Sequence, residues 1–440
     1  MLLRWATLLV LLASFFPFLA SAQTRPVAAR AVVQAASTPT DSPITEYRRP
    51  PDKLKQAQGL DRIRRLLFVG RTVWSVAVLA LLLNFRTGAR FRDWAEAASR
   101  RRVMQAAVFV SLLSLTLGVL NLPVDTYRHH LRTDYGLSVQ GWPSWLWDWT
   151  KSQFLGILGL TLLAWGFYAI LRRWPQRWWL YAWAGALPVI LLLVFLHPLV
   201  IDPMFNKFSP LATQRPALVE QIEKVVQRGG LDIPRSRMFE MRASEKVTTY
   251  NAYVTGVGAS KRVVVWDNTA RDLTPAQTLF IYGHEQGHYV LHHIWQGLVL
   301  GALGLLVGLY LAHRASGWML ARWGARWGLR GLDDWASLPA LLLLATVLQL
   351  VGEPLGAAFS RHLEHQADIY GLEVIHGLVP DSSQAAAQSF QRLGEKGLSV
   401  PAPDPLFVFW TYTHPPIADR VRFALEYQPW REGREPRYVR

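Results

Sequence analysis

Cysteine is absent from this 440-residue sequence. The chain therefore forms no disulfides and offers no thiolate ligands, so any bound metal must be held by histidine and carboxylate side chains. This absence leaves the redox state of the surrounding compartment open. The sequence also lacks internal repeats, so its organisation has to be traced through apolar segments and short motifs.

Acidic residues are scarce relative to basic ones. The chain has 31 Asp and Glu against 47 Lys and Arg, a formal net charge of +16, which is compatible with nucleic-acid binding. The arginines, however, gather in short segments between long apolar blocks, 51% of the residues are hydrophobic, and there are 20 tryptophans. This pattern predicts a mainly α-helical polytopic membrane protein whose partner is the lipid bilayer, with no nucleic acid.

Six apolar segments are long enough, or nearly so, to cross a bilayer. They are residues 66–85, 103–122, 154–171, 179–200, 297–311 and 338–359. Charged residues within them are sparse, Arg71 and Glu353 being the main ones. This scarcity weighs against a transporter or channel, which is the main alternative for a protein with so many spans.

A His-Glu-x-x-His motif occupies residues 284–288. Thr274, a following proline and Gln277 predict that a helix begins just upstream with a capping box. Residues four apart share a helix face, so His284 and His288 can reach one ion, while Glu285 can act on a metal-bound water. This is the signature of zinc hydrolases in which the Glu is the general base, although two histidines also fall four apart by chance.

Two imidazoles leave zinc underligated, and a third His or a carboxylate usually completes the site. A third His six residues after the second is excluded, because that position is Ile294. The segment after the last apolar run supplies Glu364 as the predicted third ligand and, one turn on, Asp368 to orient a ligand imidazole. A solvated helix face is the alternative for both carboxylates. The alternative third ligands are His293, His362 and His365.

The predicted domains follow from the spans and the motif. Residues 1–22 combine Arg4, an apolar run and an Ala-Ser-Ala end, which predicts a signal peptide or an uncleaved first transmembrane helix. Residues 23–65 are rich in Pro, Ala, Thr and charge and predict an exposed linker. The remaining units are four transmembrane helices at 66–200, a zinc metalloprotease domain at 201–295, two transmembrane helices at 296–359, and the C-terminal part of the protease domain at 360–440.

A β-hairpin is predicted just ahead of the metal-binding helix. Residues 246–267 contain two β-branched runs separated by a loop with Gly256, Gly258 and Ser260.

Five motifs occur in order along the chain. They are Phe205-Asn206-x-Phe208-x-Pro210-Leu211, Asn251-Ala252-Tyr253, His284-Glu285-x-x-His288, Ser360-Arg361-x-x-Glu364-x-Gln366-Ala367-Asp368 and Thr413-His414-Pro415-Pro416. Together they resemble the type I CAAX prenyl proteases, integral-membrane zinc endopeptidases related to HtpX. The resemblance implies a helical barrel around an internal chamber, with a small α+β zinc metalloprotease domain that contains the metal-binding helix and an edge β-hairpin.

The resemblance also implies the roles of individual residues. The implied site consists of the zinc ligands His284, His288 and Glu364, the general base Glu285, the substrate-binding pair Asn251 and Ala252, and the catalytic pair His414 and Arg420. An exposed strand edge binds an extended peptide through backbone hydrogen bonds. A tetrahedral intermediate needs a donor or a positive charge beside the metal. Tyr250 departs from the small polar residue or His that the family usually has beside Asn251.

We therefore expect a membrane-embedded zinc metalloendopeptidase with one Zn²⁺ per chain, in which Glu285 moves the proton. The implied partner is a peptide or protein substrate, with a C-terminal lipidated peptide and general membrane-protein or peptide turnover both open. The alternatives are a non-proteolytic transporter and a zinc-binding membrane scaffold, and the intact Glu285 weighs against the scaffold.

Short cationic loops predict the orientation, because such loops stay in the cytoplasm. Residues 86–102, 172–178 and 314–331 are rich in arginine, whereas the longer segment 123–153 carries only three basic residues. This alternation predicts a multi-pass protein of a bacterial-type inner membrane with its active site on the extracytoplasmic side.

Overall fold

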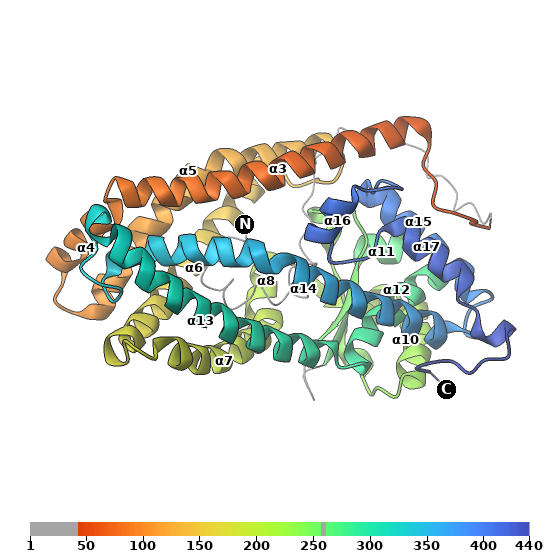
Figure 1. Ribbon diagram of the computed structural model, residues 1–440. Helices are drawn as coiled ribbons and strands as arrows, with labels where there is room; N and C mark the ends of the chain where they lie inside the picture. The colour runs from red at the N-terminus through yellow and green to blue at the C-terminus, as the bar shows by residue number, and fades with distance from the viewer. Residues whose placement is uncertain (1–42, 257–260, 440) are drawn as a thin grey trace.

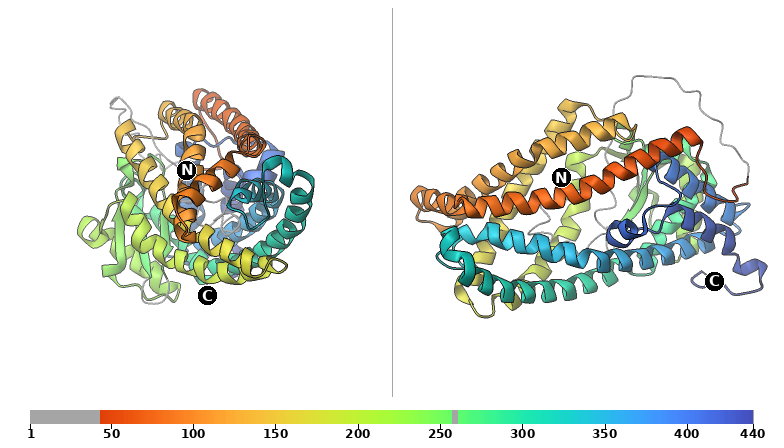
Figure 2. Two further views of the ribbon diagram at one scale, coloured as in Figure 1. Left: turned by 90° about the vertical axis from the view of Figure 1, so that its left-hand side faces the viewer. Right: turned by 45° about the horizontal axis from the view of Figure 1, so that its top comes forward.

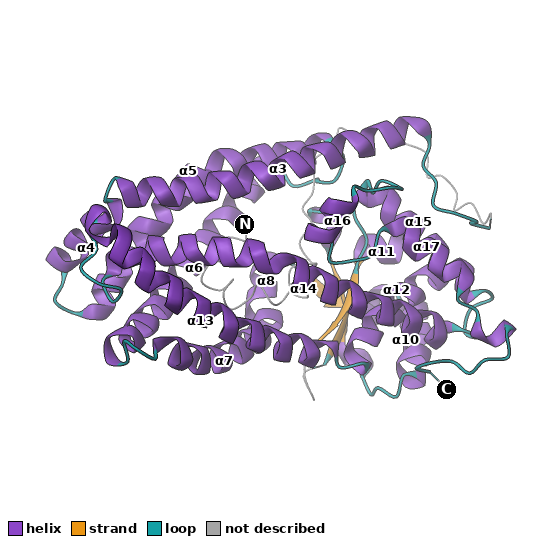
Figure 3. Cartoon of the chain, viewed as in Figure 1, coloured by secondary structure: helices purple, strands orange, loops and turns teal. Residues whose placement is uncertain are grey.

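The computed structural model describes residues 43–256 and 261–439. The predicted signal segment at 1–22, the first part of the predicted linker, and Gly258 and Ser260 of the predicted hairpin loop lie outside the described residues. Within the described ranges the protein is mostly helical, with one small sheet near one end (Figure 3).

Six helices of the described chain are long and apolar enough to cross a membrane, as the sequence predicts. They run alongside one another (Figure 1) and, viewed end-on, form a ring (Figure 2). Their bounds are α3 Pro51–Asn84, α5 Arg102–Asp134, α6 Trp142–Arg173, α7 Trp178–Leu196, α13 His293–Trp327 and α14 Leu338–Ile375. A π-helical segment, His197–Ile201, and the short α8, Asp202–Phe205, prolong α7.

The fifth span is longer than its predicted range of 297–311. Helix α13 has 35 residues and continues well past the apolar run. It ends where Gly328 adopts a φ of +72°, a left-handed conformation that glycine accepts without strain. The helix stop is therefore set by this glycine and not by the end of the apolar sequence.

The predicted exposed linker is wrong over residues 51–65, which form the first turns of α3. Ala57 and Leu60 lie three residues apart on one helix face and are buried in a cluster with Leu398 and Val400. Ahead of the helix, Tyr47 is buried and its hydroxyl donates to the Ser399 carbonyl at 2.9 Å. The composition of this segment is polar, but the spacing of its few apolar residues decides its structure.

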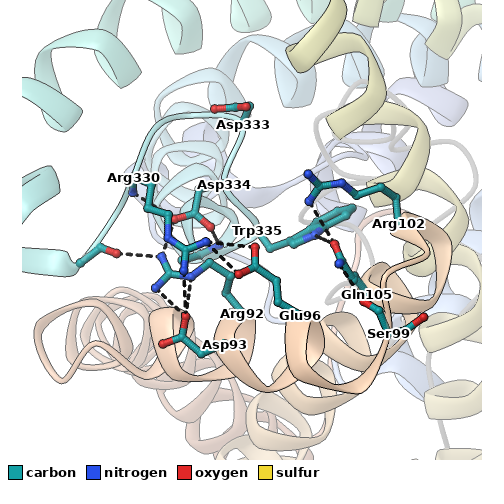
Figure 4. A network of polar contacts seen from close by, with 12 residues as sticks. Arg92, Asp93, Glu96, Ser99, Arg102, Gln105, Arg330, Asp333, Asp334 and Trp335 are labelled. Atoms are coloured by element: carbon teal, nitrogen blue, oxygen red, sulfur yellow. Dashed lines mark hydrogen bonds and ion pairs between the residues drawn. The ribbon is translucent and has the colours of Figure 1, made fainter.

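Helix α4, Thr87–Ala98, lies at the end of the helical ring remote from the sheet (Figure 1). The buried Arg92 of α4 places Nη1 2.6 Å from Oδ2 of Asp334, in the loop before α14 (Figure 4). Arg330 pairs with two carboxylates of α4, and the Trp335 indole donates to the Gln105 side chain of α5 at 3.3 Å. These ion pairs and hydrogen bonds connect α4, α5 and the loop before α14.

The other end of the ring meets a four-stranded sheet in the order β1-β2-β4-β3. The strands are β1 Phe208–Pro210, β2 Met238–Met241, β3 Ala252–Thr255 and β4 Arg262–Trp266. Strands β3 and β4 pair antiparallel with Ala252 opposite Val265, which confirms the predicted hairpin, whereas β2 runs parallel to β4 and was not predicted.

Seven further α-helices lie in this part of the described chain. They are α9 Leu211–Gln214, α10 Pro216–Arg228, α11 Asp267–Asp272, α12 Pro275–Val290, α15 Ser382–Gly397, α16 Pro405–Thr411 and α17 Ile417–Glu426. Helix α12 is buried on most sides, and its Phe280 packs edge-on against Phe390 of α15 with ring centroids 5.0 Å apart. The core of this domain is thus built around the helix that carries the His-Glu-x-x-His motif.

A cavity of about 790 Å³ lies between the domain and the long helices, lined by residues of both. A second cavity of about 440 Å³ lies among α3, α5, α6 and α14. Arg64 of α3 lines both. The predicted fold class, a helical barrel with an internal chamber and a small α+β domain, is confirmed.

Candidate active site

Helix α12 begins as the sequence predicts. Thr274 Oγ1 accepts a hydrogen bond from the Gln277 backbone N–H at 3.3 Å, and Gln277 Oε1 accepts from the Thr274 N–H at 3.1 Å. This capping box satisfies two N–H groups that the first helical turn leaves without partners. The helix is therefore fixed at its start, ten residues before the first histidine of the motif.

Glycines allow α12 and α14 to approach closely. A Cβ at Gly283 would lie 2.7 Å from Val374 Cγ1, and a Cβ at Gly371 would lie 3.0 Å from the His284 backbone nitrogen. No other residue fits these positions without displacing backbone or packed side chains. The close crossing brings the Glu364 turn of α14 against the histidines of α12.

His284, His288 and Glu364 are all buried and form one group of candidate metal ligands. The His284 and His288 Nε2 atoms lie 3.1 Å apart, and Glu364 oxygens lie 3.3 Å from His284 Nε2 and 3.6 Å from His288 Nε2. Ligand atoms about 2.0–2.1 Å from a tetrahedral ion are roughly 3.4 Å apart. The three side chains therefore fit a metal site with a fourth position open, and Glu364 lies where a third ligand would be needed.

Asp368 lies behind His284. Its Oδ1 is 2.8 Å from His284 Nδ1, and both of its oxygens accept hydrogen bonds from the buried Arg420 guanidinium, at 2.6 and 2.9 Å. A proton on Nδ1 leaves Nε2 of His284 as a lone-pair donor toward the ligand group. Arg420 lies 3.8 Å from Glu364, so its closest contact with the site is through Asp368.

His288 is oriented by a residue that sequence reasoning assigned no such role. Its Nδ1 lies 2.9 Å from Nδ1 of His293, which is fully buried. His293 follows His288 by five residues, a spacing that faces away on a regular helix. His292 has a φ of +59° and breaks the helix between the two, which turns His293 back toward the site. No sequence pattern signals this break.

Burial holds the pKa of His288 well below its usual value, so the imidazole is neutral, as a ligand must be. Burial also raises the pKa of Glu285 to about 7. The Glu285 side chain is partly open to the 790 Å³ cavity. Glu285 is not part of the group of candidate ligands among the described residues.

His414 approaches the group from the loop before α17, with Nε2 3.2 Å from Glu364 Oε1. The Thr413 hydroxyl lies 3.0 Å from His414 Nδ1. If that hydroxyl donates, the Nε2 of a neutral His414 carries the proton and points toward the ligand group. Burial lowers the pKa of His414, which favours this neutral form.

Strand β3 has no strand partner on its outer side among the described residues, because it lies at the edge of the sheet. Asn251 and Ala252 line the same cavity as the metal group. The Asn251 Oδ1 accepts from the Ala252 N–H at 2.8 Å. This bond fixes the amide and leaves its Nδ2 as a donor.

Two protein-family profiles match this chain. The profile of the CAAX prenyl protease N-terminal region, with five membrane helices, matches residues 45–207, and that of peptidase family M48 matches residues 212–428. An uncharacterized metalloprotease of Bacillus subtilis, YhfN, is 34% identical over 85% of this chain and 86% of its own. The chain belongs to peptidase family M48.

Within this family the chain is similar to the CAAX prenyl proteases. CAAX prenyl protease 1 of Saccharomyces cerevisiae is 26% identical over 81% of this chain and 78% of its own. The crystal structure of Ste24p from S. mikatae shares the fold, with a TM-score of 0.73 over 86% of this chain and 89% of that chain at 23% identity. The M48 protein is accordingly a membrane metalloendopeptidase of the CAAX prenyl protease family, and neither a transporter nor a scaffold is favoured.

The alternative third ligands take no part in the metal group of the described residues. His293 contacts the rear nitrogen of His288, and the His365 ring packs on Phe423 with centroids 4.5 Å apart. His362 is exposed on α14.

Proposed function

We propose that this M48 protein binds one zinc ion at His284, His288 and Glu364 and hydrolyses peptides that lie along β3. The observation that supports it most is the facing pair of imidazole nitrogens. With the Nδ1 atoms of both histidines turned to other partners, two Nε2 lone pairs meet 3.1 Å apart beside a carboxylate. Such lone pairs repel one another unless a proton or a metal cation lies between them, and the adjoining Glu364 carboxylate makes the group suited to a metal cation.

Bound zinc supplies Lewis acidity toward the scissile carbonyl and lowers the pKa of water. Glu285 accepts the water proton and later delivers it to the leaving amine. The His414 N–H donates to the oxygen on which negative charge develops. Asp368 and Arg420 hold His284 in the orientation that ligation requires.

The free edge of β3 suits an extended peptide, which it binds by strand addition, and Asn251 Nδ2 adds one donor to the substrate backbone. The proposed substrates are peptides or proteins that enter the chamber. A C-terminal lipidated peptide is one such class, since several relatives are named CAAX prenyl proteases.

We further propose a bacterial-type inner membrane with the site on the extracytoplasmic side. The loops around α4, between α6 and α7, and between α13 and α14 lie at the end of the ring opposite the sheet (Figure 1). These are the arginine-rich segments, and short cationic loops stay in the cytoplasm.

A Glu285→Gln substitution tests the proposed chemistry. We expect the purified variant to bind zinc as the parent does, while hydrolysis of casein-derived and farnesylated peptides falls by a factor of about 100 or more, because only the proton acceptor is lost. Glu426→Gln, on the exposed face of α17, is the matched control and should retain activity. Zinc-dependent hydrolysis that survives in Glu285→Gln would refute the assignment of the base.

A further inference from the structure

The two ligand imidazoles differ in the residue that contacts Nδ1, the ring nitrogen that faces away from the metal group. His284 has a carboxylate at its Nδ1, supplied by Asp368 at 2.8 Å. His288 has a second imidazole, supplied by His293, with the two Nδ1 atoms 2.9 Å apart. Both ligands present Nε2 to the metal group, but only one of them is backed by a charge.

Hydrogen-bond logic fixes the direction of this contact. The Nε2 of His288 must be unprotonated to ligate, so its Nδ1 carries the proton and donates to Nδ1 of His293. His293 then carries its own proton on Nε2, which lies 3.0 Å from Gln366 Oε1 on α14. The Gln366 amide nitrogen in turn lies 3.1 Å from Nε2 of the exposed His362.

Each of these three contacts pairs a donor with an acceptor when the protons are placed in this way. The opposite tautomer of His293 would set two N–H groups against each other at 2.9 Å, or leave Gln366 Oε1 without its donor. The buried His293 cannot exchange its partner for water. This series of hydrogen bonds therefore selects one tautomer at His293 and, through it, one at His288.

We propose that His293 is a positioning residue of the metal site, held by Gln366, which fixes the tautomer and ring orientation of His288. This proposal rests on the proposed zinc site. Partners behind a ligand histidine commonly contribute 10- to 100-fold to metal affinity. A neutral imidazole acceptor should orient His288 without adding another negative charge to those of the carboxylates at the site.

The test is zinc affinity, measured on the full chain in detergent by competition with a chromophoric chelator. His293→Leu removes the acceptor and should weaken zinc binding by about 10- to 100-fold. His293→Asn places an amide oxygen near the position of Nδ1 and should restore most of that affinity. His293→Gln places its amide near the position of Nε2 and should not. A loss of packing alone would not separate Asn from Gln in this way.

Gln366→Leu provides a second measurement of zinc affinity, at a half-buried position where the fold tolerates substitution more readily. It frees His293 to change tautomer, and we expect zinc binding to weaken by several-fold. If His293→Leu cannot be purified, Gln366→Leu and the Asn and Gln variants decide the matter.

Parental zinc affinity in Gln366→Leu together with equal affinities in His293→Asn and His293→Gln would overturn the proposal. So would His293→Leu binding zinc as tightly as the parent. If the parent itself holds no zinc, the proposed metal site fails instead, so the two failures are distinguishable.

Discussion

Glu285 is the carboxylate of the site that remains available for proton transfer. Glu364 faces both imidazoles, and Asp368 is engaged by His284 and Arg420. Burial raises the pKa of Glu285 to about 7, near the value that suits a general base at neutral pH. A bound cation opposes this rise, because a nearby positive charge favours the carboxylate form.

We expect kcat/KM to fall as the pH is lowered below about 7, because protonated Glu285 cannot accept a proton from water. The cation shifts the midpoint below the value set by burial alone, so the acid limb should lie between about pH 5 and pH 7. Peptidase assays across this range, with zinc content measured at each pH, check the expectation. An acid limb that coincides with loss of zinc would contradict it, since ligand protonation would then be the cause.

At the scale of single residues, spacing predicts part of the site. The four-residue separation of His284 and His288 and the carboxylate turn at Glu364 and Asp368 follow from helix geometry and ligand chemistry. The contact of His293 with Nδ1 of His288 could not be found in this way, because it depends on the left-handed backbone of the residue before His293. A non-glycine residue in that conformation leaves no regular mark in a sequence.

At the scale of elements, α14 joins the membrane barrel to the metal site. Its 38 residues run without a break from the end near α4 to Ile375 and include Pro354. The apolar run predicts the span and the later motif predicts the ligand, but the sequence suggests a boundary near residue 360. The predicted span ends at residue 359, whereas packing of the buried last turns against α12 keeps the helix continuous to Ile375.

The contact between α4 and the loop before α14 is a buried ion pair between Arg92 and Asp334. Asp334 accepts from Arg92 Nη1 at 2.6 Å and also from the backbone N–H groups of Arg330 and Ala336. Asp334→Ala should destabilise the fold by about 3–5 kcal/mol, because it leaves the buried guanidinium of Arg92 without its closest partner. Thermal unfolding in detergent measures the effect as a lower Tm.

The matched control is Asp93→Ala. Asp93 also contacts Arg92 and Arg330, but its side chain is 55% exposed, so its removal should cost less than about 1 kcal/mol. Equal shifts in Tm for the two variants would show that the Arg92–Asp334 contact does not fasten this end of the barrel.

At the scale of the whole molecule, the arginine-rich loops and the candidate active site lie at opposite ends. The arginine-rich connections gather around α4, and the sheet, α12 and the metal group lie at the other end of the helices (Figures 1 and 2). The sequence predicts six spans and therefore this alternation. It could not predict the chamber from composition, because a ring of helices depends on which faces pack together, and the spans are nearly uniformly apolar.

This separation makes the membrane orientation directly testable. We expect the arginine-rich end to face the cytoplasm and the protease end to face outward. Because the chain has no cysteine, one engineered thiol reports one position without background. Ser236, just before β2, and Ala98, the last residue of α4, are both exposed. The sheet and α4 lie toward opposite ends of the molecule (Figure 1). In intact cells, a membrane-impermeant maleimide should label Ser236→Cys, while Ala98→Cys should react only after lysis. The reverse pattern would place the protease domain in the cytoplasm, and the charge argument would then be wrong for this protein.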